Sequence, residues 1–260
     1  MREQFRSIEC GFSWRVHAIL IAVAHSDSKV AFLFDMDGVL INSMPLHTKS
    51  WEVYLQRLGV TVQDLEARMH GRRNPELVRD LLGDDLAEDV VLEHGAAKER
   101  LFRELMGEAI SEFEIPGLLD FLNRYREVPK AIGSNAERAN IDFTLDRLGL
   151  RPYFQVLVDG AEVTRPKPYP DVYLLAAQRL GFAPADCIVF EDSPAGTDAA
   201  LQAGMRVVAL ETIPTEFSGV DLVIKDFLDA KLEPWIRAQL SRETISAETK
   251  ASLAGTGVNH

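Results

Sequence analysis

Short apolar runs separated by amphipathic segments place the strongest constraint on how this 260-residue chain can fold. The runs occupy residues 30–34, 130–133, 155–158, 187–190, 206–210 and 221–224. Helical spacing appears between them, for example over 136–148 and 170–180. Strands that alternate with helices form parallel sheets, because each crossover lays a helix against a face of the sheet. The sequence therefore predicts an α/β fold with a Rossmann-like parallel sheet.

One long interval contains no strand-like run. Residues 44–114 hold only amphipathic segments such as LHTKSWEVYLQRLG, NPELVRDLLG and HGAAKERLFRELM. The pattern predicts an all-helical domain inserted between the first and second strands. We expect the α/β core at 29–43 and 115–228, and a C-terminal tail at 229–260.

The first 28 residues allow two interpretations. Three arginines precede the apolar stretch 16–24, and AVA before a polar segment resembles a signal-peptidase site. Two glutamates and the long leading region favour a poorly ordered N-terminal extension instead. The apolar stretch is shorter than the roughly 18 residues that a membrane-spanning helix needs.

Composition narrows the class of protein. A net charge of -12 argues against a nucleic-acid surface, which needs clustered Lys and Arg. With 47% hydrophobic and 26% charged residues, the chain is typical of a soluble globular protein without a membrane partner. Only Cys10 and Cys187 occur, so a disulfide framework is not expected. We expect a cytoplasmic monomer.

Polar residues follow the apolar runs where each predicted strand ends. In an open parallel sheet the ligand site lies outside the carboxyl ends of the strands. The sequence therefore predicts that the residues at these ends converge, namely Asp35, Asp37, Ser134, Asn135, Glu191 and Asp192, with Lys167 from the loop TRPKPYP.

This set of side chains suits phosphate chemistry. Asp35 and Asp192, with Glu191 as a possible third, offer the oxygen ligands that Mg²⁺ takes together with a substrate phosphate. Lys167 lies between two prolines that limit its loop, so its ammonium can be aimed at both the acids and a phosphoryl oxygen. Ser134 and nearby backbone N–H groups can bind further oxygens. A carboxylate held near phosphorus can then attack it and form an aspartyl-phosphate.

The motifs DMDGV, GSN, RPKP and EDSPAG, in this order, resemble those of the haloacid dehalogenase (HAD) superfamily over nearly all of residues 29–228. The stretch INSMPLHTKSW resembles its β-phosphoglucomutase-like branch, whose helical cap would correspond to the insertion. The resemblance implies that Asp35 is the nucleophile, Asp37 the general acid/base, and Ser134 and Lys167 the phosphoryl binders. It also implies a Mg²⁺ site formed by Asp35, Asp37, Glu191 and Asp192.

Asp37 raises a question that the sequence leaves open. An unperturbed aspartate that donates a proton at pH 7 works about 3 units above its pKa, which costs about 4 kcal/mol. Asp37 therefore needs a shifted pKa, or it must acquire its proton in another step. Gly38 beside it gives the loop the φ freedom for a close approach of backbone to phosphate.

The expected substrate contacts in the cap are His47, Lys98, Arg72, Arg73 and Asn74, with Gly38 and Asn135 in the core. The branch places a histidine and a lysine at the first two of these positions. Asn74 stands where the mutase has a phosphate-binding arginine, although Arg72 and Arg73 lie close and could substitute. Glu137 stands where the mutase has a lysine, and an acid there would repel a second phosphate.

These features favour a Mg²⁺-dependent phosphatase that hydrolyses a small phosphorylated substrate, expected to be a sugar phosphate. A phosphomutase is the first alternative, since it uses the same aspartyl-phosphate. The second is a binding or regulatory module that is phosphorylated on Asp35 and turns over slowly. The helical insertion and the position of Asp37 favour an enzyme, and a dehalogenase would have no need of the second acid.

Overall fold

The computed structural model describes residues 28–69, 72–212 and 215–241. Within them, parallel strands form one six-stranded sheet in the order β3-β2-β1-β4-β5-β6. The strands are β1 Ala31–Phe34, β2 Lys130–Gly133, β3 Val156–Val158, β4 Cys187–Glu191, β5 Arg206–Leu210 and β6 Leu222–Ile224. The predicted α/β fold is confirmed. The predicted N-terminal extension and its alternative, an export signal, lie outside the described residues except for Ser28.

Strand β1 lies at the centre of the sheet, between β2 and β4. All four of its residues are fully buried, which its unbroken apolar sequence predicts for a strand covered on both faces. Phe32 and Phe34 pack into one hydrophobic layer, and Ala31 and Leu33 into the other. The direction of strand order reverses at this strand, so its carboxyl end is the expected ligand crevice.

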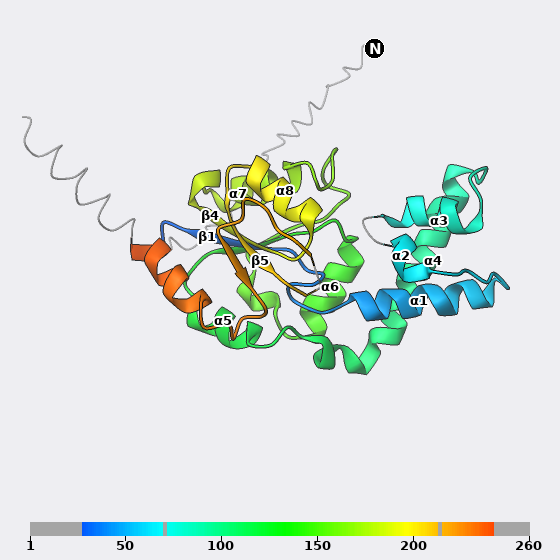
Figure 1. The fold of residues 1–260 in the computed structure, drawn as a ribbon, viewed down its shortest axis with the longest axis horizontal. Coiled ribbons are helices and arrows are strands. Elements are labelled where there is room, and N and C mark those ends of the chain that lie inside the picture. Colours follow the sequence, from blue (N-terminus) through cyan, green and yellow to red (C-terminus); the bar gives the residue numbers. More distant parts are fainter. Residues whose placement is uncertain (1–27, 70–71, 213–214, 242–260) are drawn as a thin grey trace, which may run out of the picture.

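Helices cover both faces of the sheet (Figure 1). One face packs against α5 (Leu118–Arg124) and α6 (Arg138–Arg147), and the other against α7 (Asp171–Leu180) and α8 (Pro194–Gln202). Short 3₁₀ turns, η2 (Arg151–Tyr153) and η3 (Pro184–Asp186), precede β3 and β4. Each helix presents an apolar stripe to the sheet, so the two buried layers hold it from both sides.

The insertion forms a separate helical body at the right of Figure 1, which we call the cap. It contains α1 (Met44–Arg57), α2 (Leu65–Met69), α3 (Asn74–Leu82), α4 (Glu88–Met106) and η1 (Gly107–Phe113). Its own core includes Trp51, Leu55, Leu77 and Val91. No strand occurs among its described residues, so the predicted all-helical cap is confirmed.

The C-terminal region departs from the prediction of a tail from residue 229. Residues 232–241 are helical, and Leu232 and Ile236 are buried in the same layer as Phe32. Apolar side chains at this spacing cover the sheet beside α5, so the core extends at least to residue 241. The other domain boundaries remain predictions.

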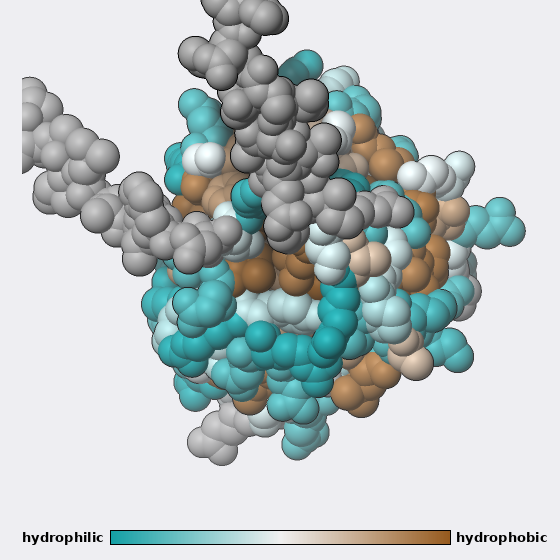
Figure 2. Space-filling view, turned by 90° about the vertical axis from the view of Figure 1, so that its left-hand side faces the viewer, coloured by the Kyte–Doolittle hydropathy of each residue, from teal (hydrophilic) through white to brown (hydrophobic). Residues whose placement is uncertain are grey.

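The end of the molecule opposite the cap is shown in Figure 2. Its visible described atoms are hydrophilic over much of the lower part, and the hydrophobic ones form separate groups. Scattered apolar groups of this kind are normal on the surface of a folded protein. In the part of the chain that the structure describes, every helix is too short or too polar to cross a bilayer.

Candidate active site

The carboxyl edge of the sheet brings the predicted acids and the lysine together. Asp35 follows β1, Ser134 follows β2, Glu191 ends β4 and Asp192 follows it. Lys167 reaches the same place from the loop between β3 and α7. All of these residues are more than nine-tenths buried, so the site is built inside the protein rather than on its surface.

Lys167 is the central cation of this edge. Its Nζ lies 2.9 Å from Asp35 Oδ1 and 2.7 Å from Glu191 Oε1. Burial alone would lower the pKa of Lys167, but the two carboxylates outweigh it and raise the pKa. The lysine is therefore charged at neutral pH, and it stands beside the predicted nucleophile.

Both carboxylate oxygens of Glu191 accept several hydrogen bonds. Oε1 accepts from Lys167 and, at 3.0 Å, from the Tyr173 hydroxyl. Oε2 accepts from the backbone N–H groups of Asp192 and Ser193, each at 2.8 Å, and from the Ser193 hydroxyl. A Cβ added at Gly196 would lie 1.6 Å from Oε1, so only glycine lets α8 approach this closely. Glu191 is thus fixed, and it orients Lys167.

Asp35, Glu191 and Asp192 form a group that fits a divalent cation. One oxygen from each lies within 4.8 Å of the others. Burial and the neighbouring acids raise the pKa of Asp35 to about 6, although Lys167 opposes the rise. Burial, Glu191 and Asp35 also raise the pKa of Asp192. Because the acids repel one another, a hard cation such as Mg²⁺ would favour their ionised forms.

Gly38 allows the loop after β1 to pass directly over Asp192. Its φ is +71°, and a Cβ built there would lie 1.7 Å from Asp192 Oδ2. Any other residue would be both strained and in collision with the acid. Asp192 Oδ2 accepts a hydrogen bond from the Thr212 hydroxyl at 2.8 Å, a contact that the sequence analysis did not identify.

Asp37 turns away from this group toward the cap. Its Oδ1 accepts a hydrogen bond of 2.5 Å from the Ser43 hydroxyl and lies 3.7 Å from His47 Nε2. Burial would raise the pKa of Asp37, but His47 and Ser43 outweigh it and lower the pKa. In this arrangement the carboxylate is ionised at neutral pH. The sequence left two possibilities open, a raised pKa of Asp37 or a proton acquired in another step. The pKa of Asp37 is lowered rather than raised, which leaves the second possibility.

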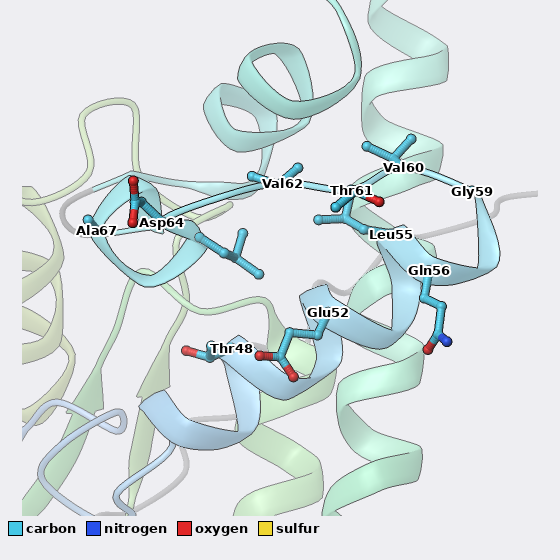
Figure 3. A pocket seen from close by; sticks show the side chains of 11 residues that line it. Thr48, Glu52, Leu55, Gln56, Gly59, Val60, Thr61, Val62, Asp64 and Ala67 are labelled. Carbon is cyan, nitrogen blue, oxygen red and sulfur yellow. The ribbon is translucent and has the colours of Figure 1, made fainter.

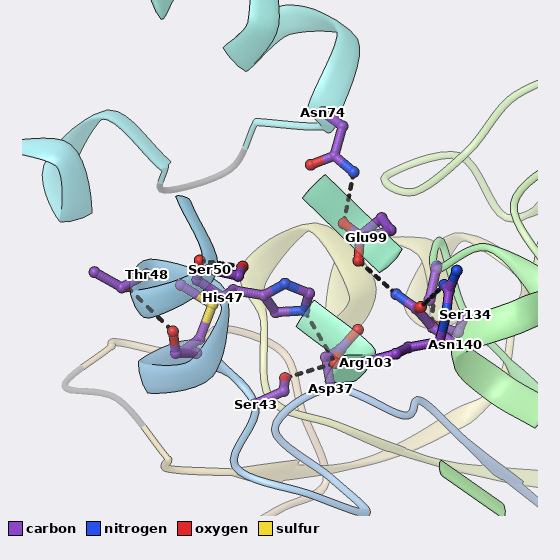
Figure 4. A network of polar contacts seen from close by, with 12 residues as sticks. Asp37, Ser43, His47, Thr48, Ser50, Asn74, Glu99, Arg103, Ser134 and Asn140 are labelled. Carbon is purple, nitrogen blue, oxygen red and sulfur yellow. Dashed lines mark hydrogen bonds and ion pairs between the residues drawn. The ribbon is translucent and has the colours of Figure 1, made fainter. Parts of the chain in front are cut away.

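A buried network of cap side chains continues from His47 (Figure 4). The imidazole stacks on the Phe102 ring with centroids 3.9 Å apart, and its Nδ1 lies 2.6 Å from Lys98 Nζ. Lys98 donates to Glu99 at 2.8 Å, and these two side chains are only 2% and 6% exposed. Of the predicted cap residues, His47 therefore lies beside Asp37, and Lys98 lies on the other side of the imidazole.

Glu99, Arg103 and Asn140 also belong to this network, and the sequence analysis assigned none of these three residues to the site. Glu99 accepts hydrogen bonds from Asn74 at 2.6 Å and from Asn140 at 2.7 Å. Arg103 donates to Asn140 and to Glu137, each at 2.5 Å. The available signal was the spacing of Glu99 and Arg103, which places them on one face of a helix.

The remaining predicted residues are placed differently. Arg72 pairs with Asp80 at 2.9 Å, and Arg73 with Glu76 at 3.5 Å, so neither arginine is directed to the acids by these contacts. Both have about half of their side chains exposed, at 45% and 53%.

Ser134 and Asn135 hold the loops of the edge. The Ser134 hydroxyl, which is buried, accepts from Ala136 N at 3.2 Å. The side chain of Asn135 accepts from Lys167 N at 3.1 Å and so positions the lysine loop. Asn135, predicted as a substrate contact, is thus engaged with the protein in this structure.

A separate hollow lies on the cap between α1 and residues 59–67 (Figure 3). Thr48, Glu52, Gln56 and Asp64 are among its lining residues, and it contains none of the predicted site residues. Chemistry is placed at the sheet edge instead, because the buried acids and Lys167 lie there.

Comparisons with known proteins point to one family of hydrolases. A model of the haloacid dehalogenase-like hydrolases matches residues 30–204. Hexitol phosphatase A of Escherichia coli is 34% identical over 203 residues, which cover 74% of this chain and 89% of the relative. The β-phosphoglucomutase of Bacillus subtilis is 29% identical, with 78% and 92% covered. The crystal structure of CbbY from Rhodobacter sphaeroides in complex with phosphate has a TM-score of 0.67 at 27% identity, covering 77% of this chain and 95% of that one.

Proposed function

The chain belongs to the haloacid dehalogenase-like hydrolase family, as its motifs predicted, and from this premise we propose that it is a Mg²⁺-dependent phosphatase of sugar phosphates. The observation that carries the proposal is the buried Asp35 carboxylate beside the charged Lys167, 2.9 Å away. A buried nucleophile next to a fixed cation suits attack on an anionic phosphoryl group.

The first step transfers the phosphoryl group to the protein. An oxygen of Asp35 attacks phosphorus, the bond from phosphorus to the ester oxygen breaks, and the leaving oxygen takes a proton from Asp37. Lys167 and the Ser134 hydroxyl bind the phosphoryl oxygens. Water then attacks the aspartyl-phosphate, Asp37 accepts a proton from it, and phosphate leaves with Asp35 restored.

The low pKa of Asp37 requires that its proton arrives in another step. A phosphate monoester has a second pKa of about 6, so part of its population still carries a proton near neutral pH. Asp37 can take that proton once it leaves Ser43 and His47. The contacts with these two residues thus hold Asp37 ionised until substrate is present.

Asp35 and Asp192 are the side chains that would hold Mg²⁺, with Glu191 behind them. Both oxygens of Glu191 already accept hydrogen bonds from the protein, so we assign it to orienting Lys167 rather than to direct ligation. The Asp37 side chain is directed to the cap, which leaves it out of the ligand set in this arrangement. When bound, the ion would neutralise charge on the phosphoryl oxygens and the acids.

Hydrolysis is favoured over phosphomutase chemistry by the pairing of the cap cations. A mutase must bind a second, unreacting phosphate, and arginine suits that best. Arg72 and Arg73 are paired with acids, and Asn74 donates to Glu99. Glu137, predicted to repel a second phosphate, forms an ion pair with Arg103. The pair partly neutralises Glu137, but it also engages the arginine. Each of these arginines would have to abandon a carboxylate before it could bind a phosphate.

The relatives direct the choice of substrates. One is named a hexitol phosphatase and another a β-phosphoglucomutase, so both names point to phosphorylated carbohydrates. The test measures phosphate release with Mg²⁺ from sugar monophosphates, phosphoglycolate and nucleotides. We expect the sugar phosphates to have the highest kcat/KM. Absence of hydrolysis across the whole panel would overturn the proposal.

A second assay separates the mutase alternative. It supplies β-glucose 1-phosphate with catalytic glucose 1,6-bisphosphate and Mg²⁺, and it follows glucose 6-phosphate and free phosphate together. We expect free phosphate to dominate. Formation of glucose 6-phosphate many times faster than phosphate release from any sugar phosphate would show a mutase instead.

A further inference from the structure

A buried amide of the core is held by the cap. Asn140 lies on α6 of the core and is 2% exposed. Its Nδ2 donates to Glu99 Oε2 at 2.7 Å, and its Oδ1 accepts from Arg103 Nη1 at 2.5 Å. Both partners belong to α4 of the cap, so the two ends of one amide are held by one helix (Figure 4).

The spacing on α4 explains how one helix makes both contacts. Glu99 and Arg103 are four residues apart, so they lie one turn apart on the face toward α6. Lys98 precedes Glu99 and is therefore rotated by about 100° around the helix, which directs it toward His47. A fixed contact at Glu99 and Arg103 thus also fixes the direction of Lys98.

We propose that Glu99, Arg103, Glu137 and Asn140 form a clasp that sets the rotation of α4, and with it the position of Lys98 and His47 over Asp37. They act as positioning residues, since none of them contacts Asp35, Asp192 or Lys167 in the structure. The proposal rests on the proposed phosphatase function, because its purpose is to align the cap for release of the leaving group.

Burial makes the clasp selective for one arrangement. Glu99 accepts hydrogen bonds from Asn74, Lys98 and Asn140, and its side chain is 6% exposed. If α4 turned or shifted, the carboxylate and the Asn140 amide would lose partners in a dry environment. The cap is therefore seated in one register, and other registers leave buried polar groups unsatisfied.

The test moves the negative charge of the clasp from residue 99 on α4 of the cap to residue 140 on α6 of the core. Asn140→Asp places a carboxylate against Glu99, and repulsion should displace α4. The double variant Glu99→Gln with Asn140→Asp restores the pair with its polarity reversed, because the introduced glutamine amide can donate to the introduced aspartate. That aspartate still accepts from Arg103, and the total charge equals that of the unchanged protein.

Two substrates distinguish positioning from general damage. A sugar phosphate needs the cap and a proton for its leaving oxygen, whereas acetyl phosphate releases acetate, which needs no proton. We expect Asn140→Asp to lower kcat/KM for the sugar phosphate about tenfold or more, because misplaced groups lose much of their effect. Hydrolysis of acetyl phosphate should fall less than about threefold, and the double variant should recover most of the loss.

Equal loss with both substrates, no loss with either, or a double variant no better than Asn140→Asp would each overturn the clasp. Hydrogen exchange in residues 95–106 gives a readout that does not depend on activity, and it should speed up in Asn140→Asp and recover in the double variant. If Asn140→Asp does not fold, Arg103→Met tests the same contact. If the wild-type protein hydrolyses none of the substrates but hydrogen exchange in the variants changes as expected, the proposed function is refuted and the clasp is retained.

Discussion

The two halves of the proposed active site are built in different ways. The phosphate side consists of strand ends and short loops, where Asp35, Lys167 and Asp192 are held by the sheet and by close backbone contacts such as Gly38. The proposed leaving-group side consists of helical side chains of the cap, where His47 lies beside Asp37 and Lys98 contacts His47. The first half is set by topology, and the second by docking of one body on another.

This difference predicts where substitutions act. A strand end in a parallel sheet has its place fixed by hydrogen bonds on both sides, so a change of side chain there alters chemistry and leaves geometry intact. A helix in the cap can turn or shift, so a change there alters alignment. The predictions that follow test this division, beginning with the largest effect.

Replacing the proposed nucleophile, Asp35, should have the largest effect. Asp35→Asn is nearly isosteric at a strand end, and we expect turnover to fall about a thousandfold or more because the amide cannot attack phosphorus. Circular dichroism and thermal unfolding should show that the variant is folded. The exposed Asp84→Asn is the matched control and should keep full activity. Near-normal turnover in folded Asp35→Asn would rule out the covalent mechanism.

Removal of Mg²⁺ should cause the second-largest loss of activity. With excess chelator, phosphate release should fall about a hundredfold or more, because the acids then repel one another and the substrate. Added Mg²⁺ should restore the rate, whereas Ca²⁺ should fail because it does not enforce octahedral geometry. Full activity in excess chelator would exclude a metal at Asp35 and Asp192.

A substitution on the cap side should act more weakly. His47→Gln keeps a polar side chain near Asp37 but loses the stacking on Phe102, and we expect kcat for a sugar phosphate to fall about tenfold. Acetyl phosphate hydrolysis should stay near normal. The measurement is kcat of the variant for both substrates. A loss as large as that of Asp35→Asn would contradict the division of the site into two halves.

The smallest effect concerns stability in the absence of metal. Folded Asp35 keeps its proton up to about pH 6, whereas its ordinary pKa is 3.8, so the folded state binds more protons between these values. Stability from this group is therefore lost as pH rises through that window. The lowered pKa of Asp37 has its effect below 3.8, outside the window.

The measurement is thermal unfolding of the metal-free protein between pH 4 and 7, where each 1 kcal/mol shifts Tm by about 2–4 °C. Asp35→Asn should weaken the fall in Tm with rising pH, and Mg²⁺ should raise Tm more at pH 7 than at pH 5. The same pH dependence in the variant would assign the effect to other groups.

Much of the fold and the phosphate side was predictable from the sequence. The apolar runs at 30–34 and 187–190 are long enough for buried strands, and parallel topology brings whatever follows them to one edge. Asp35, Glu191, Asp192 and Lys167 could be collected in this way without coordinates. Gly38 was predicted to give backbone freedom, and the structure adds a specific reason, the contact with Asp192.

Tertiary structure alone decided the rest. The Glu99 and Arg103 pattern on α4 suits a solvated helix face equally well, and only the docking of the cap brings these residues to Asn140. The helix at 232–241 was missed for a related reason, since its apolar residues matter only beside the sheet. Local sequence determines the strands and the residues at their ends. The contacts between cap and core depend on how the helices are oriented relative to one another, and side-chain packing selects that orientation.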